Sequence, residues 1–292
     1  MGAGFADNLT RFVFERAAVR GAVVSLDAAY RDILACHPYP SGLQSLIGET
    51  LAAMCLLANS LKFSGSLILQ FHGAGRLRLF VVECSAALEL RATAQWEGEI
   101  AADARLTDLL GEDPESRMVI TLDPKDGGPL YQGVVGREGG SVGASFEHYL
   151  AKSEQIDSRL WLRAAQGRAR GVLLQRMPAS SEADAATWRR AAGAVADAAF
   201  LFDAPDAHAA LVGLFPTDDV RAFRPRQPRF GCSCSRPRVA AVLRLLGSGE
   251  VESILEERGS VGVDCEFCNR RYEFAPAEAR ALFADPSAAV VH

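Results

Sequence analysis

The sequence lacks a long apolar stretch and a leader-like start. Its longest apolar run, around Leu51 to Leu57, is far shorter than the roughly 20 residues that a membrane-spanning helix needs. The first thirty residues carry charged side chains such as Asp7, Arg11 and Arg20 and contain no apolar core segment, so no signal peptide is expected. These two features predict a cytoplasmic protein that does not associate with a membrane.

A net positive charge is missing as well. The formal net charge is −5, so the chain as a whole does not have the basic character expected of a nucleic-acid-binding protein. Apolar residues make up 49% and charged residues 23% of the chain, which is typical of a globular protein and excludes bulk disorder and a disulfide-dense secreted scaffold. The length of 292 residues suits one large domain or two modest ones.

Residues 1–178 are predicted to form an α+β domain. A helix with a wide apolar face is expected over Leu43–Leu61, and Cys55 lies on that face as a small core residue. The turn sequences at 73–75 and 123–128 are typical of connections between neighbouring strands. Strands joined by such turns favour an antiparallel sheet with helices packed on it. The predicted strand segments are Leu9–Val24 (interrupted at Gly21), Ser66–His72, Leu77–Cys84, Leu88–Gln95, Arg117–Leu122 and Leu130–Gly136, followed by a short helix over Ser145–Lys152.

Residues 179–231, here called the linker, have a different composition. They are rich in alanine, carry mixed charges and show no β-type pattern. Two apolar islands, Phe200–Phe202 and Leu211–Phe215, interrupt this helix-permissive stretch, and a proline-punctuated hinge, Arg224–Arg229, ends it. We interpret the segment as a helical linker whose surface helices pack on the first domain. A sharper interpretation is that this packing is only marginally stable.

The seven cysteines fall into two groups. Cys36, Cys55 and Cys84 are scattered singly, and apart from the core position of Cys55 the sequence assigns them no role. The other four crowd the last quarter of the chain as Cys-x-Cys, thirty intervening residues, and Cys-x-x-Cys; they are Cys232, Cys234, Cys265 and Cys268. Because cytosolic thiols stay reduced, such clusters are metal-bound or catalytic more often than disulfide-bonded.

Residues 232–292 are predicted to form a small zinc-binding domain. In an extended segment, residues two apart point to the same side, so Cys232 and Cys234 can present both sulfurs together. A turn between two hairpin arms brings Cys268 beside Cys265. Four thiolates are the ligands of a structural zinc site, whereas iron–sulfur clusters have different cysteine spacings. The predicted elements are a helix capped by Ser235 and ended by Gly247, a second helix closed by Gly259, the arms Val261–Asp264 and Arg271–Phe274, and a last helix over Ala277–Phe283.

The small size of this domain gives the metal a structural role. A single core in so small a module supplies at most about 3–5 kcal/mol, whereas structural zinc contributes about 10–16 kcal/mol of apparent binding energy. Oxidation consumes thiolate ligands and should therefore unfold the domain. Because short loops close most readily, the nearest disulfide partners are Cys232 with Cys234 and Cys265 with Cys268. Four arginines flank the cysteines and would help to keep the sulfurs ionised: Arg236, Arg238, Arg270 and Arg271.

Two segments contain the clustered cysteines. They are Phe230–Val239, with the sequence Phe-Gly-Cys-Ser-Cys-Ser-Arg-Pro-Arg-Val, and Asp264–Phe274, with the sequence Asp-Cys-Glu-Phe-Cys-Asn-Arg-Arg-Tyr-Glu-Phe. Both resemble the heat-shock protein 33 family of redox-activated holdase chaperones. The likeness covers nearly the whole chain through four further segments: Gly48–Ala53, Leu61–Gly65, Tyr131–Val135 and Tyr149–Gln155. The pairing of Cys-x-Cys with Cys-x-x-Cys is unusual among zinc modules, which makes the resemblance specific.

The resemblance implies a cytoplasmic, ATP-independent chaperone and not an enzyme. It implies that the four clustered cysteines hold one zinc ion while the protein is reduced and idle. Oxidation would then form the disulfides Cys232 with Cys234 and Cys265 with Cys268, zinc would leave, and the carboxy-terminal domain would unfold. The linker would lose its packing, and an active homodimer would bind unfolded or partly folded client proteins under oxidative stress.

Two other functions stay open on the residues alone. Cysteine spacing does not separate a redox sensor from a zinc ribbon that binds nucleic acid or a transcription partner through the nearby arginines, although the acidic net charge argues against that ribbon. A thiol oxidoreductase would depend on Cys265 for turnover of a dithiol substrate. A Gly-x-Ser-x-Gly match at 139–143 lacks the strand and helix context of a hydrolase, and His148 is not expected to be a ligand, so no catalytic site is predicted there.

Overall fold

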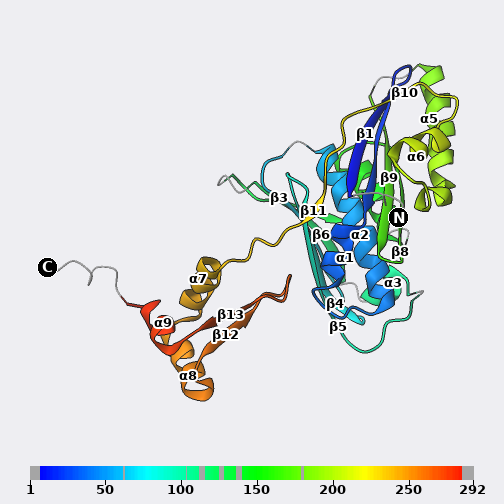
Figure 1. Cartoon of the computed structure of the whole chain (residues 1–292). Coiled ribbons are helices and arrows are strands. Elements are labelled where there is room, and N and C mark those ends of the chain that lie inside the picture. Colours follow the sequence, from blue (N-terminus) through cyan, green and yellow to red (C-terminus); the bar gives the residue numbers. More distant parts are fainter. Residues whose placement is uncertain are drawn as a thin grey trace. The chain divides into compact units, whose positions relative to one another are not determined.

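The computed structural model of the chain describes residues 7–61, 63–102, 104–111, 116–124, 128–135, 140–178 and 181–284. The chain divides into two compact units (Figure 1). The large unit comprises residues 1–231 and the small unit residues 232–292. Each unit has its own β-sheet structure and its own hydrophobic core. The predicted α+β class is confirmed.

A six-stranded sheet forms one layer of the large unit. Its strand order is β11-β5-β4-β3-β6-β7, and every neighbouring pair is antiparallel except β11 with β5. The predicted strands of this sheet are confirmed. Residues 125–127 of the turn predicted at 123–128 lie outside the described residues. The strands are β3 (Ser66–His72), β4 (Leu77–Ser85), β5 (Glu89–Trp96), β6 (Arg117–Asp123), β7 (Tyr131–Val135) and β11 (Arg229–Phe230).

The second sheet of the large unit is antiparallel throughout, with the order β10-β1-β2-β9-β8. The prediction of a strand broken at Gly21 is wrong, because the break lies at residues 15–18, between β1 and β2, and Gly21 is inside β2. A Cβ at Gly21 would lie 2.3 Å from Cζ of Phe12 and 2.4 Å from the carbonyl oxygen of Leu173, so glycine permits this close approach. The strands are β1 (Asn8–Phe14), β2 (Val19–Leu26), β8 (Ser158–Ala165), β9 (Arg168–Arg176) and β10 (Val220–Ala222).

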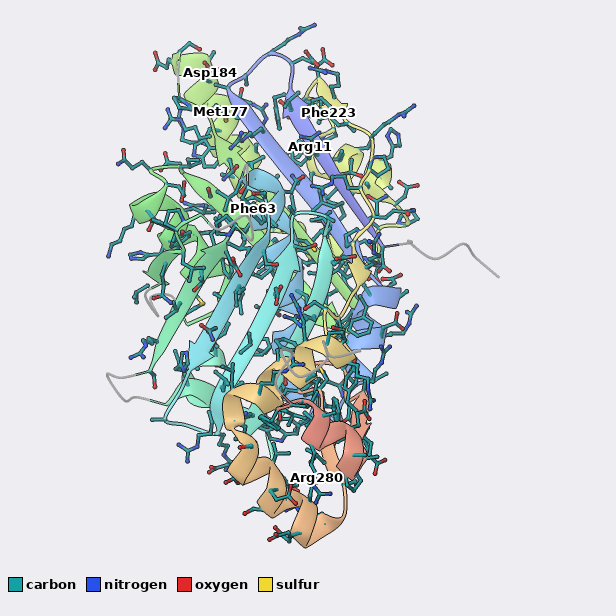
Figure 2. The ribbon with its side chains drawn as sticks, turned by 90° about the vertical axis from the view of Figure 1, so that its left-hand side faces the viewer. Arg11, Phe63, Met177, Asp184, Phe223 and Arg280 are labelled. Carbon is teal, nitrogen blue, oxygen red and sulfur yellow. The ribbon has the colours of Figure 1, made fainter. Side chains whose placement is uncertain are left out.

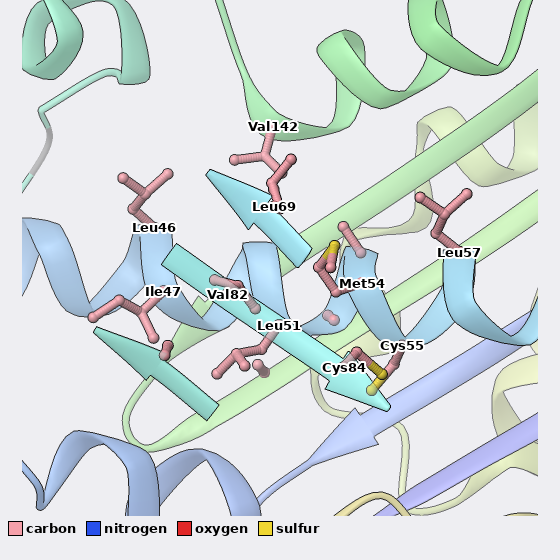
Figure 3. Close-up of a cluster of buried hydrophobic side chains, with 14 of the residues drawn as sticks. Leu46, Ile47, Leu51, Met54, Cys55, Leu57, Leu69, Val82, Cys84 and Val142 are labelled. Atoms are coloured by element: carbon pink, nitrogen blue, oxygen red, sulfur yellow. The ribbon is translucent and has the colours of Figure 1, made fainter. Parts of the chain in front are cut away.

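Helix α2 (Ser41–Ser60) lies at the centre of the main core of the large unit. It contacts strands of both sheets, and the buried side chains around it form one continuous cluster (Figure 3). This confirms the predicted helix and the core position of Cys55, which is completely buried. Among the described helices, α2 alone is long and apolar enough to cross a membrane. However, 78% of its 18-residue apolar window is buried, as expected of a core helix. The shorter helices are α1 (Ala28–Leu34), α3 (Leu106–Leu110) and α4 (Val142–Ser153).

Ser141, the central residue of the Gly-x-Ser-x-Gly match, has a structural role. Its hydroxyl accepts a hydrogen bond from the backbone N–H of Ala144 at 3.2 Å and so caps the first turn of α4. Gly139 of the same match lies outside the described residues. The described part of this segment is therefore a helix start.

The linker packs on the five-stranded sheet through a second apolar cluster. The ring of Phe215 lies with its centroid 5.5 Å from that of Phe12 and 4.9 Å from that of Phe14, and Trp188 joins the same cluster. The prediction that this segment contains no strand is wrong, since β10 pairs with β1 and β11 with β5; strands this short show no two-residue period. The helices of the linker are α5 (Glu182–Ala196), a 3-10 helix (Ala198–Phe202) and α6 (Ala207–Leu214).

In its described residues, 232–284, the small unit consists of three short helices and a two-stranded hairpin. Ser235 caps the first helix as predicted, because its hydroxyl accepts from the N–H of Arg238 at 3.5 Å. Gly247 and Gly259 end two helices with φ values of 99° and 76°, in the left-handed region that favours glycine. The elements are α7 (Arg236–Leu246), α8 (Ser248–Arg258), β12 (Val261–Asp264), β13 (Arg271–Phe274) and α9 (Pro276–Ala281).

Candidate metal centre

The four clustered cysteines come from two backbone segments of the small unit. Cys232 and Cys234 lie in the stretch that precedes α7, and Cys265 and Cys268 lie in the turn between β12 and β13. Two hydrogen bonds shape that turn: the N–H of Cys265 donates to the carbonyl of Arg270 at 3.0 Å, and the N–H of Asn269 donates to the carbonyl of Cys265 at 2.8 Å. The turn thus brings the last two cysteines together as predicted.

The four sulfur atoms are gathered at ligand spacing. All lie within 4.8 Å of one another, with Sγ–Sγ distances of 3.7 Å between Cys232 and Cys265 and 3.4 Å between Cys234 and Cys268. A tetrahedral zinc–thiolate site, with Zn–S of about 2.3 Å, has sulfur atoms about 3.8 Å apart, whereas a disulfide joins them at about 2.05 Å. The donor set and its spacing therefore fit a metal ion, and all four cysteines are reduced.

Electrostatics within the cluster favour a thiolate at one position. Burial acts to raise the pKa of Cys234, but the hydrogen bond that its sulfur accepts from the hydroxyl of Tyr272 at 3.1 Å, with contacts from the other thiols, outweighs burial and lowers the pKa to about 7. Burial, aided by contacts with the neighbouring thiols, raises the pKa of Cys268 well above its usual range. A bound cation would ionise the remaining thiols, because the ligands of zinc are thiolates.

The arginines that flank the cysteines differ in what they contact. Arg236 donates to the Glu278 carboxylate at 2.8 Å and to the Glu273 carbonyl at 2.7 Å, and it stacks on Phe274. These contacts hold α7, β13 and α9 together. The guanidinium of this residue is therefore neutralised by a carboxylate and serves the fold of the small unit.

The other three flanking arginines each have a different kind of partner. Arg271 pairs with Asp264 at 3.1 Å across the hairpin, and Arg238 donates to the carbonyl of Ser233 at 2.9 Å. Arg270 interacts with the hydroxyl of Tyr272 and, electrostatically, with two of the thiols. Of the four predicted supporters of sulfur ionisation, the contacts assign that role to Arg270.

The three scattered cysteines take no part in the cluster. Cys36 is partly exposed near the end of α1, where its thiol donates to the carbonyl of Asp32 at 3.3 Å. Cys55 and Cys84 are completely buried in the main core of the large unit (Figure 3). Within the described ranges, the four sulfurs of the small unit are the one group of three or more possible ligands that gathers in this way.

Comparison with known proteins is consistent along the whole chain. The family model described as Hsp33 protein matches residues 7–275. A 33 kDa chaperonin of Methylobacillus flagellatus is 42% identical over 282 residues, covering 95% of this chain and 94% of the relative. A 33 kDa chaperonin of Pseudomonas aeruginosa is 41% identical over 286 residues, covering 95% of each. The crystal structure of a 33 kDa chaperonin from Thermotoga maritima has the same fold, with a TM-score of 0.78 at 18% identity, over 94% of this chain and 97% of that one.

Proposed function

The chain belongs to the Hsp33 family of chaperones, and we propose that it is a redox-regulated holdase. Its curated relatives are named chaperonins, which are not enzymes. In the proposed cycle the reduced protein is idle and holds one zinc ion per chain. Oxidation of the cysteines unfolds the small unit, and the protein then prevents the aggregation of unfolding client proteins under oxidative stress.

The observation that carries this proposal is the placement of four reduced cysteines, gathered at ligand spacing, inside a unit with a minimal core. Nine buried residues make up that core in the described part of the unit, and Cys234 and Cys265 border it. Bound zinc would cross-link two segments of the small unit through Cys232, Cys234, Cys265 and Cys268. Because so small a core contributes only about 3–5 kcal/mol, loss of this cross-link removes most of the stability of the unit.

The oxidation step needs a two-electron oxidant for each disulfide. With hydrogen peroxide, two thiolates and two protons give one disulfide and two water molecules. We propose the pairs Cys232 with Cys234 and Cys265 with Cys268, as the shortest loops allow. Disulfide mapping tests this pairing directly, since the Sγ–Sγ contacts of 3.7 Å and 3.4 Å join one segment to the other.

Chain connectivity supports a route from the small unit to the linker. Cys232 follows β11 after a single residue, and β11 pairs with β5 over only two residues. A short strand of this kind frays readily once the adjacent segment is unfolded. Release of the linker would uncover Phe12, Phe14 and the apolar faces of the linker helices, which gives a surface for apolar client segments. A homodimer in the cytoplasm is part of the same proposal.

The alternative of a zinc ribbon that binds nucleic acid has less support. Two of its four candidate arginines are paired with carboxylates, Arg236 with Glu278 and Arg271 with Asp264. A phosphate backbone would have to compete with these partners.

The test is a peroxide titration of the reduced, zinc-loaded chain at mildly elevated temperature. Zinc content, free-thiol count and suppression of client aggregation are measured on the same samples. We expect one zinc per chain at the start, loss of four thiols with release of the metal, and a rise in aggregation suppression over the same range. Equal suppression before and after oxidation would refute the redox switch, and retention of zinc after thiol loss would refute the ligand assignment.

A further inference from the structure

A cavity of about 210 Å³ lies in the large unit, where β1, β2 and β9 meet the end of α2 and the linker. Arg11, Arg20 and Gln175 supply most of its polar lining, together with Asn59 and Ser60 at the end of α2. None of the described residues that line it is acidic. The four clustered cysteines all belong to the small unit, so the proposed thiol chemistry does not use this cavity.

Gln175 lines this cavity and is almost completely buried. The residue is 2% exposed, and its Oε1 accepts a hydrogen bond from Nε of Arg20 at 3.1 Å. That bond fixes the orientation of the amide, because a flipped amide would place two donors against each other. The Nε2 group therefore points away from the Arg20 Nε, and within the described part of the chain it has no hydrogen-bond partner. This nitrogen is closed off from the cavity, so Gln175 holds Arg20 in place and does not itself contact a ligand there.

The two arginines give the cavity a positive charge. Arg20 forms no ion pair with any described residue, and burial alone accounts for the lowering of its pKa. Arg11 stacks over the ring of Phe223 with its guanidinium carbon 5.3 Å from the ring centroid (Figure 2). Both groups remain charged at neutral pH. The partial negative charge at the end of α2, about half a unit, is smaller than these two full charges.

The rest of the lining is apolar and includes Phe12, Leu56, Leu173 and Phe223. An inorganic anion would leave this apolar surface without a contact, whereas an organic anion would use both parts of the lining. Arginine pairs well with carboxylates, which also accept hydrogen bonds from amides. The volume is below the roughly 300–1,000 Å³ of pockets for drug-sized ligands, so the ligand is small.

We propose that this cavity binds a small organic carboxylate with a compact apolar body. The carboxylate accepts hydrogen bonds from the guanidinium of Arg20, and Arg11 adds a second positive charge. The apolar body packs against Phe12 and Leu56.

Such a ligand would also favour the packed form of the linker, a consequence that rests on the proposed function. Phe223 belongs to the linker and Arg11 to β1, and the N–H of Phe223 donates to the carbonyl of Arg11 at 2.8 Å. The complete cavity exists only while these two segments are paired. A carboxylate that binds the complete cavity stabilises this state by mass action, so it should slow activation by peroxide.

The probe for the test is benzoate. Benzamide is its neutral analogue, and inorganic phosphate serves as an anion that has no apolar group. Binding to the reduced, zinc-loaded full chain is measured by titration calorimetry. We expect benzoate to bind at least about tenfold more tightly than either comparison compound, because a charge-assisted hydrogen bond is worth that factor or more. Arg20→Gln should weaken benzoate binding about tenfold, whereas Arg16→Gln, on an exposed turn outside the lining, should leave it unchanged.

Circular dichroism and zinc content confirm that each variant is folded, and Arg11→Gln replaces Arg20→Gln if the latter is not. Equal binding of benzoate and benzamide, no benzoate binding at millimolar concentration, or unchanged affinity in the arginine variant would overturn the site. Preferential binding of phosphate would overturn the organic carboxylate. Benzoate binding without slower activation would overturn the effect on the linker alone. Failure of peroxide to activate the ligand-free protein would overturn the proposed function and leave the direct binding result intact.

Discussion

Cysteine has opposite environments in the two units. In the large unit Cys55 and Cys84 have no exposed surface, and their sulfur atoms lie next to each other in the main core (Figure 3). Burial raises the pKa of Cys55 far above its usual range, which keeps that thiol protonated and unreactive. In the small unit the four clustered thiols are partly exposed, and the pKa of Cys234 is lowered to about 7. The contrast teaches that burial depth and hydrogen-bond donors, not residue type, decide which thiols are reactive.

The same contrast holds for the way each unit is stabilised. The main core of the large unit joins two sheets and α2 in one apolar cluster. The small unit has nine buried core residues, and its two cysteine-bearing segments are held beside them. Stability of the large unit is therefore distributed over many contacts, whereas under the proposed function stability of the small unit depends on the chemical state of four sulfurs.

Removal of the metal should break this comparison most strongly. A zinc-specific chelator, or Cys265→Ser, is expected to unfold the small unit, because about 10–16 kcal/mol of apparent binding energy is lost. Hydrogen exchange should show loss of amide protection in α7, α8 and β12, while α2 keeps its protection. Cys36→Ser, outside the cluster, is the matched control and should change neither unit. Full protection of the small unit after complete chelation would contradict the proposed role of the metal.

Weakening the contact between linker and sheet should give the next largest effect. Phe215 is 3% exposed and packs against Phe12 and Phe14. Phe215→Ala should cost about 3–5 kcal/mol of the linker packing and raise aggregation suppression before any oxidant is added, with zinc still bound. Val212→Ala, at a position that is 53% exposed, should leave both stability and basal activity unchanged. Unaltered basal activity in a folded Phe215→Ala protein would argue against the linker as the activated element.

Acid should sharpen the comparison, since the two units are expected to respond in opposite directions. Burial raises the pKa of Glu49 on α2 to about 7, so the native large unit retains a proton that the unfolded chain releases near pH 4.5. Stability of the large unit should therefore fall as pH rises from about 4.5 to 7, by at most about 3 kcal/mol. The metal site has the reverse dependence, because protons compete for its thiolates.

Urea unfolding of the large unit at several pH values between 5 and 7.5 checks this sign. Glu49→Gln keeps the size of the side chain and removes its ionisation, so most of the slope should disappear. A wild-type stability that rises with pH over this range, or a slope retained in the variant, would show that other groups control the pH response.

The smallest effect is expected from the hydrogen bond beside the cluster. Tyr272→Phe removes the hydroxyl that donates to Cys234 Sγ but keeps the ring in the core of the small unit. Loss of such an outer hydrogen bond typically weakens metal binding about 10–100-fold. Competition with a zinc chelator of known affinity measures this change. Phe274→Leu controls for packing, because it alters a core ring that makes no hydrogen bond to a cysteine. Equal zinc affinities of wild type and Tyr272→Phe would exclude a role for the hydroxyl.

Local sequence pattern predicted the elements that depend on local chemistry. The apolar periodicity of α2 and the turn residues between β3 and β4 are sufficient to place these elements. The prediction missed β8 and β9. Within β9, Arg170 and Gly171 interrupt the apolar pattern that is typical of a buried strand. Arg170 is buried there with its guanidinium 2.5 Å from the carboxylate of Asp27, and that distant partner is visible only in the folded chain.

The same division applies to the sites. The spacing of Cys232, Cys234, Cys265 and Cys268 predicted their gathering, since each pair lies within one short segment. The ion pairs of the flanking arginines were not predicted, because Arg236 meets Glu278 only after the helices have packed. The cavity in the large unit carries no sequence motif, as its polar residues come from β1, β2, β9 and α2.

The pairing of β1 with β10 has a consequence for folding during synthesis on the ribosome. Phe14 near the amino terminus pairs with Val220 in the linker, and synthesis delivers the amino-terminal part first. The edge of β1 that pairs with β10 therefore has no partner strand until almost all of the large unit has been translated. The clustered cysteines emerge later still, so the proposed binding of the metal cannot precede synthesis of the strand that closes this edge.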